Sequence, residues 1–223
     1  MKVNVLSSTE FPQTLIWQAM HQCYSTNPVY DVCSKSEREY GELVVKHLLK
    51  GGRGHWSPLE QAHMSLNLTE VPLPIVVQFE RHRLFSYSEQ SLRYTAIDSG
   101  ADSIYTRPEG AYKSRNGKTY VVDESRRSQR LQMIEQLLDF YNKEIEDGVA
   151  EEDARFLLPL GVKKNLVMGG NLRAWLHLMD MRLKANAQLE AQQLADLIHD
   201  KLVDWVPEIM YYYDNEHKTR LMP

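Results

Sequence analysis

Residues 81–94 read RHRLFSYSEQSLRY and concentrate three arginines, one histidine and three serines around a single acid, Glu89. Arginine presents a planar fork of donors that matches phosphate oxygens, and serine hydroxyls add further donors. A carboxylate can orient a guanidinium or accept a hydrogen bond from a base or sugar. The apolar run at 71–79, VPLPIVVQF, should anchor this stretch to the core. The stretch therefore predicts an anion-binding pocket.

A solvated basic loop, or a nonspecific patch for polyanions, is the alternative interpretation of residues 81–94, because charge clusters usually face water. The chain carries 26 Lys and Arg against 30 Asp and Glu, a formal net charge of −4. No global basic field would therefore recruit a nucleic acid, and we expect no nucleic-acid partner.

Composition predicts a single globular domain over residues 1–223, since the chain is 43% hydrophobic and 25% charged. No apolar run approaches the roughly 18 residues of a membrane helix, and the opening MKVNVLS is too short and polar for a signal peptide. We expect a cytoplasmic protein with no membrane partner. Cys23 and Cys33 should stay reduced, and the eight histidines show no metal-ligand spacing.

Periodicity and capping signals predict an α/β fold of the α+β type, with a mixed or antiparallel sheet flanked by helices. Residues 99–124 have turn signals and few large apolar residues, which predicts a long loop or loose hairpin. We expect Gly51-Gly52 to end a helix and Gly169-Gly170 to form a turn. The expected strands cover 2–6, 63–69 and 163–168, and the expected helices cover 12–24, 36–49, 74–83, 126–147, a start at 151–153, 171–184 and 187–205.

A second chemically loaded segment, 171–182, reads NLRAWLHLMDMR. With Asn171 as N-cap, Arg173 and His177 lie four apart on one side of the helix, and Asn171 and Arg182 return to a similar angle on another. The alternative interpretation of residues 171–182 is an ordinary amphipathic helix whose arginines are solvated.

Together these segments resemble the flavin-dependent thymidylate synthases, whose signature is RHRxxSxNxxSxRY. Every fixed position of that signature matches except the asparagine, which is Ser88 here. The segment GHWSPLE at 54–60 resembles the upstream GHxSxxE, and ARFLLP at 154–159 places Arg155 where the family has a substrate arginine. The resemblance covers about 51–98 and 151–194. His177, where asparagine is common, and Gln61, where histidine is common, are further departures.

The resemblance implies a thymidylate synthase-complementing protein fold and a homotetramer with FAD bound between subunits. The implied reaction is the reductive methylation of dUMP to dTMP, with 5,10-methylenetetrahydrofolate as carbon donor and NADPH reducing the flavin. Arg182 is the implied catalytic residue, because a cation on the uracil ring edge would stabilise charge there. Arg93 and Arg155, with Ser91, would hold the phosphate.

Carried over residue by residue, the resemblance gives two sets. The implied FAD contacts are Ser57, Arg81, His82, Arg83, Glu89, Asn171, Arg173 and His177. The implied contacts of the nucleotide are Gln78, Arg81, Glu89, Gln90, Ser91, Leu92, Arg93, Arg155 and Arg182. His55 is better explained by a flavin contact than by a metal. The sequence does not decide whether His82 is neutral or charged.

Two alternatives remain open at this level. A non-catalytic nucleotide- or RNA-binding protein could use the same basic motif and stack bases on Phe85, Tyr87 and Tyr94. A flavoprotein of this fold could also have lost synthase activity. Ser91 could be read as a nucleophile, but the sequence shows no base to activate it.

Overall fold

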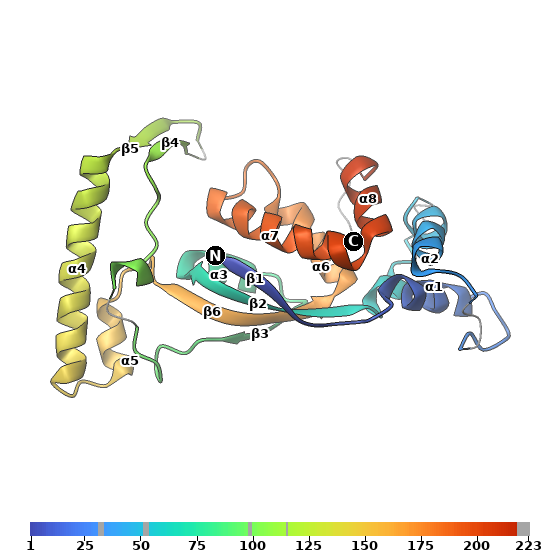
Figure 1. The fold of residues 1–223 in the computed structure, drawn as a ribbon, viewed down its shortest axis with the longest axis horizontal. Coiled ribbons are helices and arrows are strands. Elements are labelled where there is room, and N and C mark those ends of the chain that lie inside the picture. The colour runs from blue at the N-terminus through green and yellow to red at the C-terminus, as the bar shows by residue number, and fades with distance from the viewer. Residues whose placement is uncertain (31–33, 51–53, 98–99, 115, 218–223) are drawn as a thin grey trace. The chain divides into compact units, whose positions relative to one another are not determined.

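The computed structural model describes residues 1–30, 34–50, 54–97, 100–114 and 116–217, which form a mixed α/β fold (Figure 1). These residues divide into two compact units. The first unit comprises Met1–Lys2, Leu68–Arg81 and Ser88–Leu166, and the second comprises Val3–Asn67, His82–Tyr87 and Val167–Pro223. The expected α/β class is confirmed, whereas a single domain over 1–223 stays a prediction. Cys33 and the expected helix end at Gly51-Gly52 lie outside the described residues.

A four-stranded sheet runs in the order β1-β2-β6-β3, with β1 at Lys2–Ser8, β2 at His63–Pro72, β6 at Lys163–Asn171 and β3 at Ser86–Glu89. Along β2 the side chains of Met64, Leu66 and Leu68 are buried in alternation, as the period-two pattern predicts. The alternation then slips by one residue to Val71. Glu70 lies at the slip with φ of 57°, the backbone signature of a bulge that lets the strand continue to Pro72.

The expected turn at Gly169-Gly170 is wrong, because β6 continues through both glycines to Asn171. Close approach explains why glycine stands there. A Cβ on Gly169 would lie 2.8 Å from Ser65 Oγ, and one on Gly170 would lie 2.4 Å from the ring of Phe85. Glycine in a strand interior often marks such an approach rather than a turn.

The second unit contains the helices α1 (Pro12–Gln22), α2 (Glu37–Val44), α6 (Leu172–Arg182), α7 (Leu189–Trp205) and α8 (Pro207–Asn215), and a short 3-10 turn at Ser57–Glu60. Ser36 and Glu39 form the expected capping box of α2, which continues as a π-helical turn at Val45–Leu49. Helix α7 packs against both α6 and α8 (orange to red in Figure 1), and Trp175 of α6 and Ile198 of α7 are fully buried. Helix α8 was not expected from the sequence.

The first unit contains α3 (Leu73–Glu80), the hairpin of β4 (Gly110–Lys113) and β5 (Thr119–Val122), α4 (Glu124–Glu146) and α5 (Glu151–Ala154). Helix α3 ends at Glu80 and not at the expected Arg83, because Arg81 caps it and the chain enters a turn. Strands β4 and β5 pair antiparallel, so the irregular stretch contains a hairpin. The core of this unit is formed by Ile97, Ile104, Ile134, Leu138, Tyr141, Ala154 and Val162.

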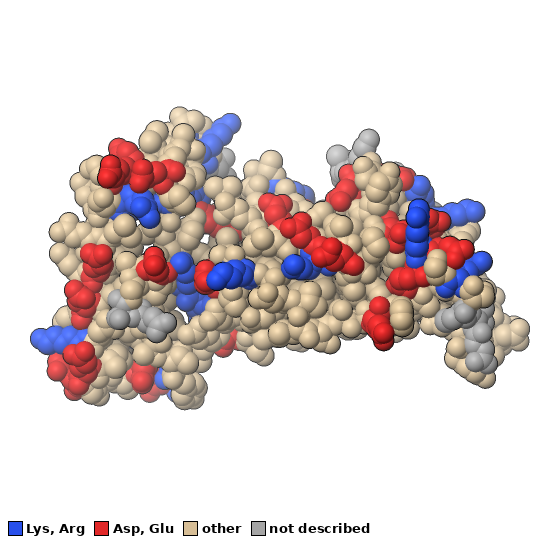
Figure 2. Space-filling view, viewed as in Figure 1, with Lys and Arg blue, Asp and Glu red and all other residues tan. Residues whose placement is uncertain are grey.

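Charged side chains of both signs are interspersed over the face shown in Figure 2. This distribution agrees with the formal net charge of −4. Among the described ranges, no helix is both long and apolar enough to cross a membrane.

Candidate functional site

The motif at 81–94 contributes to both compact units, since Arg81 and residues 88–94 belong to the first and residues 82–87 to the second. Its chemistry is therefore described as two clusters, each within one unit. The anion pocket, in the first unit, is a cavity of about 530 Å³ lined by Leu73, Glu89, Gln90, Ser91, Leu92, Arg155, Phe156 and Lys164. The structure thus brings four predicted neighbours of the nucleotide, from Glu89 to Leu92, together with Arg155.

Arg155 reaches the anion pocket from the short 3-10 turn that follows α5. Its Nε donates to the Glu152 carbonyl at 3.0 Å, and its guanidinium lies 5.8 Å from the centroid of the Phe156 ring. The Glu152 carboxylate pairs in turn with Arg93, at 2.9 Å from both Nε and Nη2. Glu152 therefore links the two arginines predicted to hold a phosphate. Both nitrogens approach the same oxygen, Oε2, so the contact orients the Arg93 guanidinium toward Glu152.

Lys164 is a residue of the pocket that sequence reasoning missed. It is only 7% exposed and forms an ion pair with Glu89. The signal was present, because Lys164 shares the buried face of β6 with Leu166 and Met168 at alternate positions. A lysine on such a face is rare unless it is paired.

The second cluster, the His82 cluster, lies within the second unit. Arg182 Nε donates to His82 Nε2 at 2.9 Å, and the Tyr87 hydroxyl donates to the His82 carbonyl at 3.0 Å. The rings of His82 and His177 lie 6.2 Å apart in an edge-on arrangement. Turn residues after α3 thus carry His82 to the C-terminal end of α6, where Arg182 lies.

Burial, and then the neighbouring Arg182 and His177, lowers the pKa of His82 to about 4. The imidazole is therefore neutral near pH 7, which the sequence left open. Because Nε2 accepts from Arg182, the ring proton is assigned to Nδ1. Burial also lowers the pKa of Arg182, but from a value so high that the guanidinium keeps its charge at neutral pH.

The N-terminal end of α6 holds three more predicted residues in the second unit. Asn171 Oδ1 accepts from the Ala174 backbone N–H at 2.9 Å, as expected of an N-cap. Arg173 pairs with Glu60, and Ser57 begins the 3-10 turn that ends at this glutamate. The GHWSPLE segment and the NLR segment are therefore neighbours in the fold.

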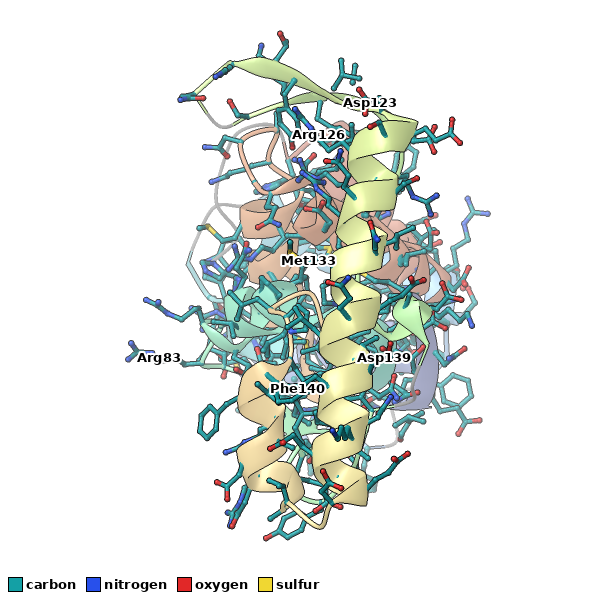
Figure 3. All side chains as sticks on the ribbon, turned by 90° about the vertical axis from the view of Figure 1, so that its left-hand side faces the viewer. Arg83, Asp123, Arg126, Met133, Asp139 and Phe140 are labelled. Carbon is teal, nitrogen blue, oxygen red and sulfur yellow. The ribbon has the colours of Figure 1, made fainter. Side chains whose placement is uncertain are left out.

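The remaining predicted residues lie on or just after α3. Gln78 Nε2 donates to the Pro74 carbonyl at 3.3 Å. Arg81 and Arg83 are exposed, and Figure 3 shows the Arg83 side chain projecting outward. Their expected contacts stay predictions.

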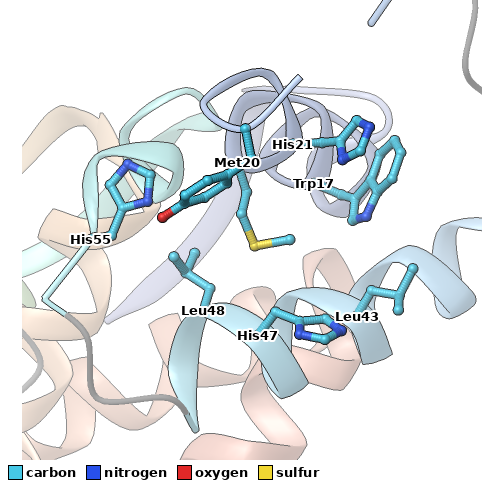
Figure 4. A pocket seen from close by; sticks show the side chains of 8 residues that line it. Trp17, Met20, His21, Leu43, His47, Leu48 and His55 are labelled. Atoms are coloured by element: carbon cyan, nitrogen blue, oxygen red, sulfur yellow. The ribbon is translucent and has the colours of Figure 1, made fainter. Parts of the chain in front are cut away.

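A separate cavity of about 400 Å³ lies in the second unit between α1, α2 and the segment around His55 (Figure 4). Trp17 and His21 stack there, with ring centroids 4.8 Å apart and an interplanar angle of 11°. At its edge, Cys23 Sγ lies 3.6 Å from His55 Nε2. The lining is mainly apolar and aromatic, unlike that of the anion pocket.

Comparison with known proteins places this chain in a family. Residues 4–208 match the family model described as thymidylate synthase complementing protein. The chain is 31% identical to a flavin-dependent thymidylate synthase of Haloarcula marismortui, over 99% of this chain and 98% of that protein. It is 29% identical to another from Halobacterium salinarum, with the same coverage of both chains.

Two solved structures share the fold. The UMP/dUMP methylase PolB from Streptomyces cacaoi, bound with 5-Br dUMP, superposes with a TM-score of 0.74 at 19% identity, covering 100% of this chain and 97% of that one. The flavin-dependent thymidylate synthase ThyX from Helicobacter pylori, complexed with FAD and dUMP, gives a TM-score of 0.68 at 18% identity, covering 92% and 97%.

Proposed function

Because this chain belongs to the thymidylate synthase complementing protein family, we propose that it is a flavin-dependent thymidylate synthase that methylates dUMP to dTMP. The observation that carries the proposal is the pairing of Arg182 with a neutral His82, on two segments that the sequence motif singles out. The anion pocket of the first unit, with Arg155 and Ser91 in its wall, is the proposed phosphate site.

The first unit holds the phosphate in this proposal. Arg93 and Arg155 are already oriented by Glu152, so little side-chain entropy is lost when an anion binds. Ser91 contributes its hydroxyl. Gln78, Arg81, Glu89, Gln90 and Leu92 complete the expected contacts with the nucleotide.

Arg182 acts on the uracil ring. Its Nε donates to His82 Nε2, which fixes the orientation of the guanidinium, and a guanidinium held in this way can stabilise oxygens that gain negative charge. A neutral His82 accepts that hydrogen bond without competing for the charge, whereas an imidazolium would repel the guanidinium. His82 therefore positions Arg182, and Arg182 stabilises the charge.

FAD fits the donor set of the second unit. Arg173, His82 and His177 are half-buried and offer guanidinium and imidazole N–H groups, and Asn171 and Ser57 stand beside them. Such donors suit a pyrophosphate and the polar edge of a flavin. Arg81, Arg83 and Glu89 are expected to add contacts. Bound FAD would supply the hydride, with NADPH as the reductant and 5,10-methylenetetrahydrofolate as the carbon donor.

Assembly as a homotetramer is part of the proposal. Helix α4 carries an apolar stripe on its exposed side, formed by Met133, Leu137 and Phe140 with exposures of 65%, 36% and 50%. The spacing places all three on one face of the helix, and Figure 3 labels two of them. An exposed apolar stripe of this kind favours burial against another subunit.

The RNA-binding alternative gains little from the aromatic side chains. Phe85 is buried against Trp175, with ring centroids 4.6 Å apart, so it cannot stack on a base. The Tyr87 hydroxyl is bound to the His82 carbonyl. Of the three aromatic residues considered, Tyr94 alone is well exposed, at 77%.

Complementation of a thymidine-requiring bacterial host tests the proposal. The wild-type gene should permit growth without thymidine, and Arg182→Ala should not. The purified protein should be yellow, and its flavin spectrum should change when dUMP is added. A colourless protein that copurifies with nucleic acid and fails to complement would favour the RNA-binding alternative.

A further inference from the structure

A carboxylate lines the same cavity as the proposed phosphate ligands. Glu89 and Arg155 both face the anion pocket, and the Glu89 side chain is only 25% exposed. A phosphate dianion and a carboxylate repel each other strongly when both are partly removed from water. The pocket therefore needs a cation that stays paired with Glu89 when the phosphate binds.

Lys164 is that cation. Its side chain is 9% exposed, and its ammonium pairs with the Glu89 carboxylate. Gln90, which follows Glu89, is hydrogen-bonded to Asn165, which follows Lys164. Gln90 N donates to the Asn165 carbonyl at 2.8 Å, and Asn165 N donates to Gln90 Oε1 at 3.3 Å. These bonds fix β3 against β6, so the ion pair is held in place by the sheet.

A second acid, Glu80 at the end of α3, interacts electrostatically with both Glu89 and Lys164. Burial and the negative charge of Glu89 raise the pKa of Glu80, and the positive charge of Lys164 opposes the rise. The charged groups near Lys164 are thus Glu80 from α3 and Glu89 from β3, and Arg155 lines the same pocket. Without Lys164, the repulsion between Glu80 and Glu89 would lose the cation that opposes it.

We propose that Lys164 is a specificity-determining residue of the nucleotide site, which neutralises Glu89 and thereby lets a 5′-phosphate bind beside that carboxylate. The role rests on the proposed function and extends it. Lys164 acts through Glu89 and is a positioning residue, so its loss should penalise the phosphorylated nucleotide and spare the nucleoside. The site would then select nucleoside monophosphates over nucleosides by charge.

The test compares dUMP with deoxyuridine on the flavin-loaded protein. Lys164→Met should weaken dUMP binding by about tenfold or more, because it leaves the partly buried Glu89 carboxylate uncompensated beside the phosphate. Binding of deoxyuridine should change by less than about threefold, since it carries no phosphate. Lys164→Arg keeps the charge and should stay close to wild type for both compounds.

A double-mutant cycle separates this role from a merely structural one. Glu89→Gln removes the charge that Lys164 neutralises, so Lys164→Met should weaken dUMP binding several-fold less in the Glu89→Gln background than in wild type, whatever Glu89→Gln costs by itself. Equal losses for dUMP and deoxyuridine, or an equal effect of Lys164→Met in both backgrounds, would overturn the proposal. If Lys164→Met does not fold, Lys164→Gln replaces it, because glutamine can still donate to Glu89.

Wild-type behaviour keeps the two hypotheses distinguishable. A wild-type protein that neither binds dUMP nor forms dTMP would refute the proposed function, whatever the Lys164 variants do. If the wild-type protein binds dUMP and forms dTMP, but Lys164→Met prefers dUMP over deoxyuridine as strongly as wild type does, only the role of Lys164 would be refuted.

Discussion

At the scale of single residues, the neutral state of His82 has a consequence for stability. The pKa of His82 falls from 6.5 to about 4 on folding, so between these pH values His82 binds a proton in the unfolded chain but not in the folded one. The contribution of His82 is complete above pH 6.5 and is lost as the pH falls toward 4. We expect wild type to lose more stability over this window than His82→Gln.

Urea unfolding of both proteins at pH 7.5, 6, 5 and 4.5 measures this difference. Glutamine retains a polar group near Arg182 but does not titrate, so the other histidines contribute equally to both curves. Parallel pH dependences for wild type and His82→Gln would mean that folding does not lower the pKa of His82.

Arg173 provides a second test at this scale, directed at the cofactor. Loss of a charge-assisted hydrogen bond typically costs about 1.5–3 kcal/mol, so Arg173→Ala should lower FAD occupancy by about an order of magnitude. Arg81→Ala should act in the same direction. The exposed Arg130 on α4 offers a matched control, and Arg130→Ala should retain FAD as wild type does. Flavin absorbance per mole of protein measures the FAD occupancy of each variant. Unchanged occupancy in Arg173→Ala would remove Arg173 from the flavin site.

The site residues show what the sequence can and cannot predict. The sequence segments drew attention to Gln90, Ser91 and Arg155, which line one cavity, and to Arg182 and His82, which are hydrogen-bonded. The roles of these residues stay predictions. Lys164 was missed although its alternation with Leu166 and Met168 marks it as a buried lysine, because its partner Glu89 depends on which strand lies beside β6. Pairing between distant strands leaves no mark in local periodicity.

At the scale of elements, a substitution at Gly170 tests why glycine stands within β6, where a turn was expected. Alanine at this position would place its Cβ 2.4 Å from the Phe85 ring, closer than atoms can pack. We expect Gly170→Ala to lower the free energy of unfolding by about 1–3 kcal/mol.

Gly100→Ala is a control for Gly170→Ala, since the nearest atom to its Cβ would lie at an ordinary 3.9 Å. It should change stability by less than about 0.5 kcal/mol. Denaturant unfolding compares the two, and equal small effects would show that Phe85 yields readily to the added methyl group.

Elements with strong local signals were predicted well and the others were not. The capping box of α2, the alternation of β2 and the N-cap Asn171 are local, and each is confirmed. Helix α8 was missed although Pro207 stands at its first position, a place where proline favours helix initiation. The end of α3 was set three residues too late because Arg81, His82 and Arg83 have acceptable helix propensity, and the turn that follows depends on tertiary contacts.

At the scale of the whole molecule, the exposed stripe on α4 predicts the state of assembly. Wild type should be a tetramer by size-exclusion chromatography with light scattering. Replacing Met133 and Phe140 by glutamate should shift it to smaller species, because a charge at each position opposes burial. Asp139→Asn, on the same helix, should leave the tetramer intact. A monomeric wild type would contradict the proposed assembly.

The formation of dTMP by the intact flavin-loaded protein tests the central claim most directly, with dUMP dissociation and single-turnover rates measured for two arginine variants. Wild type should convert dUMP to dTMP when methylenetetrahydrofolate and NADPH are present. Arg182→Lys should slow turnover more than it weakens dUMP binding, because lysine keeps the charge but loses the planar fork. Arg155→Ala should weaken binding and leave the rate at saturating dUMP closer to wild type. Absence of dTMP in the wild type would contradict the proposed function, and matching profiles for the two variants would contradict the separate roles of Arg182 and Arg155.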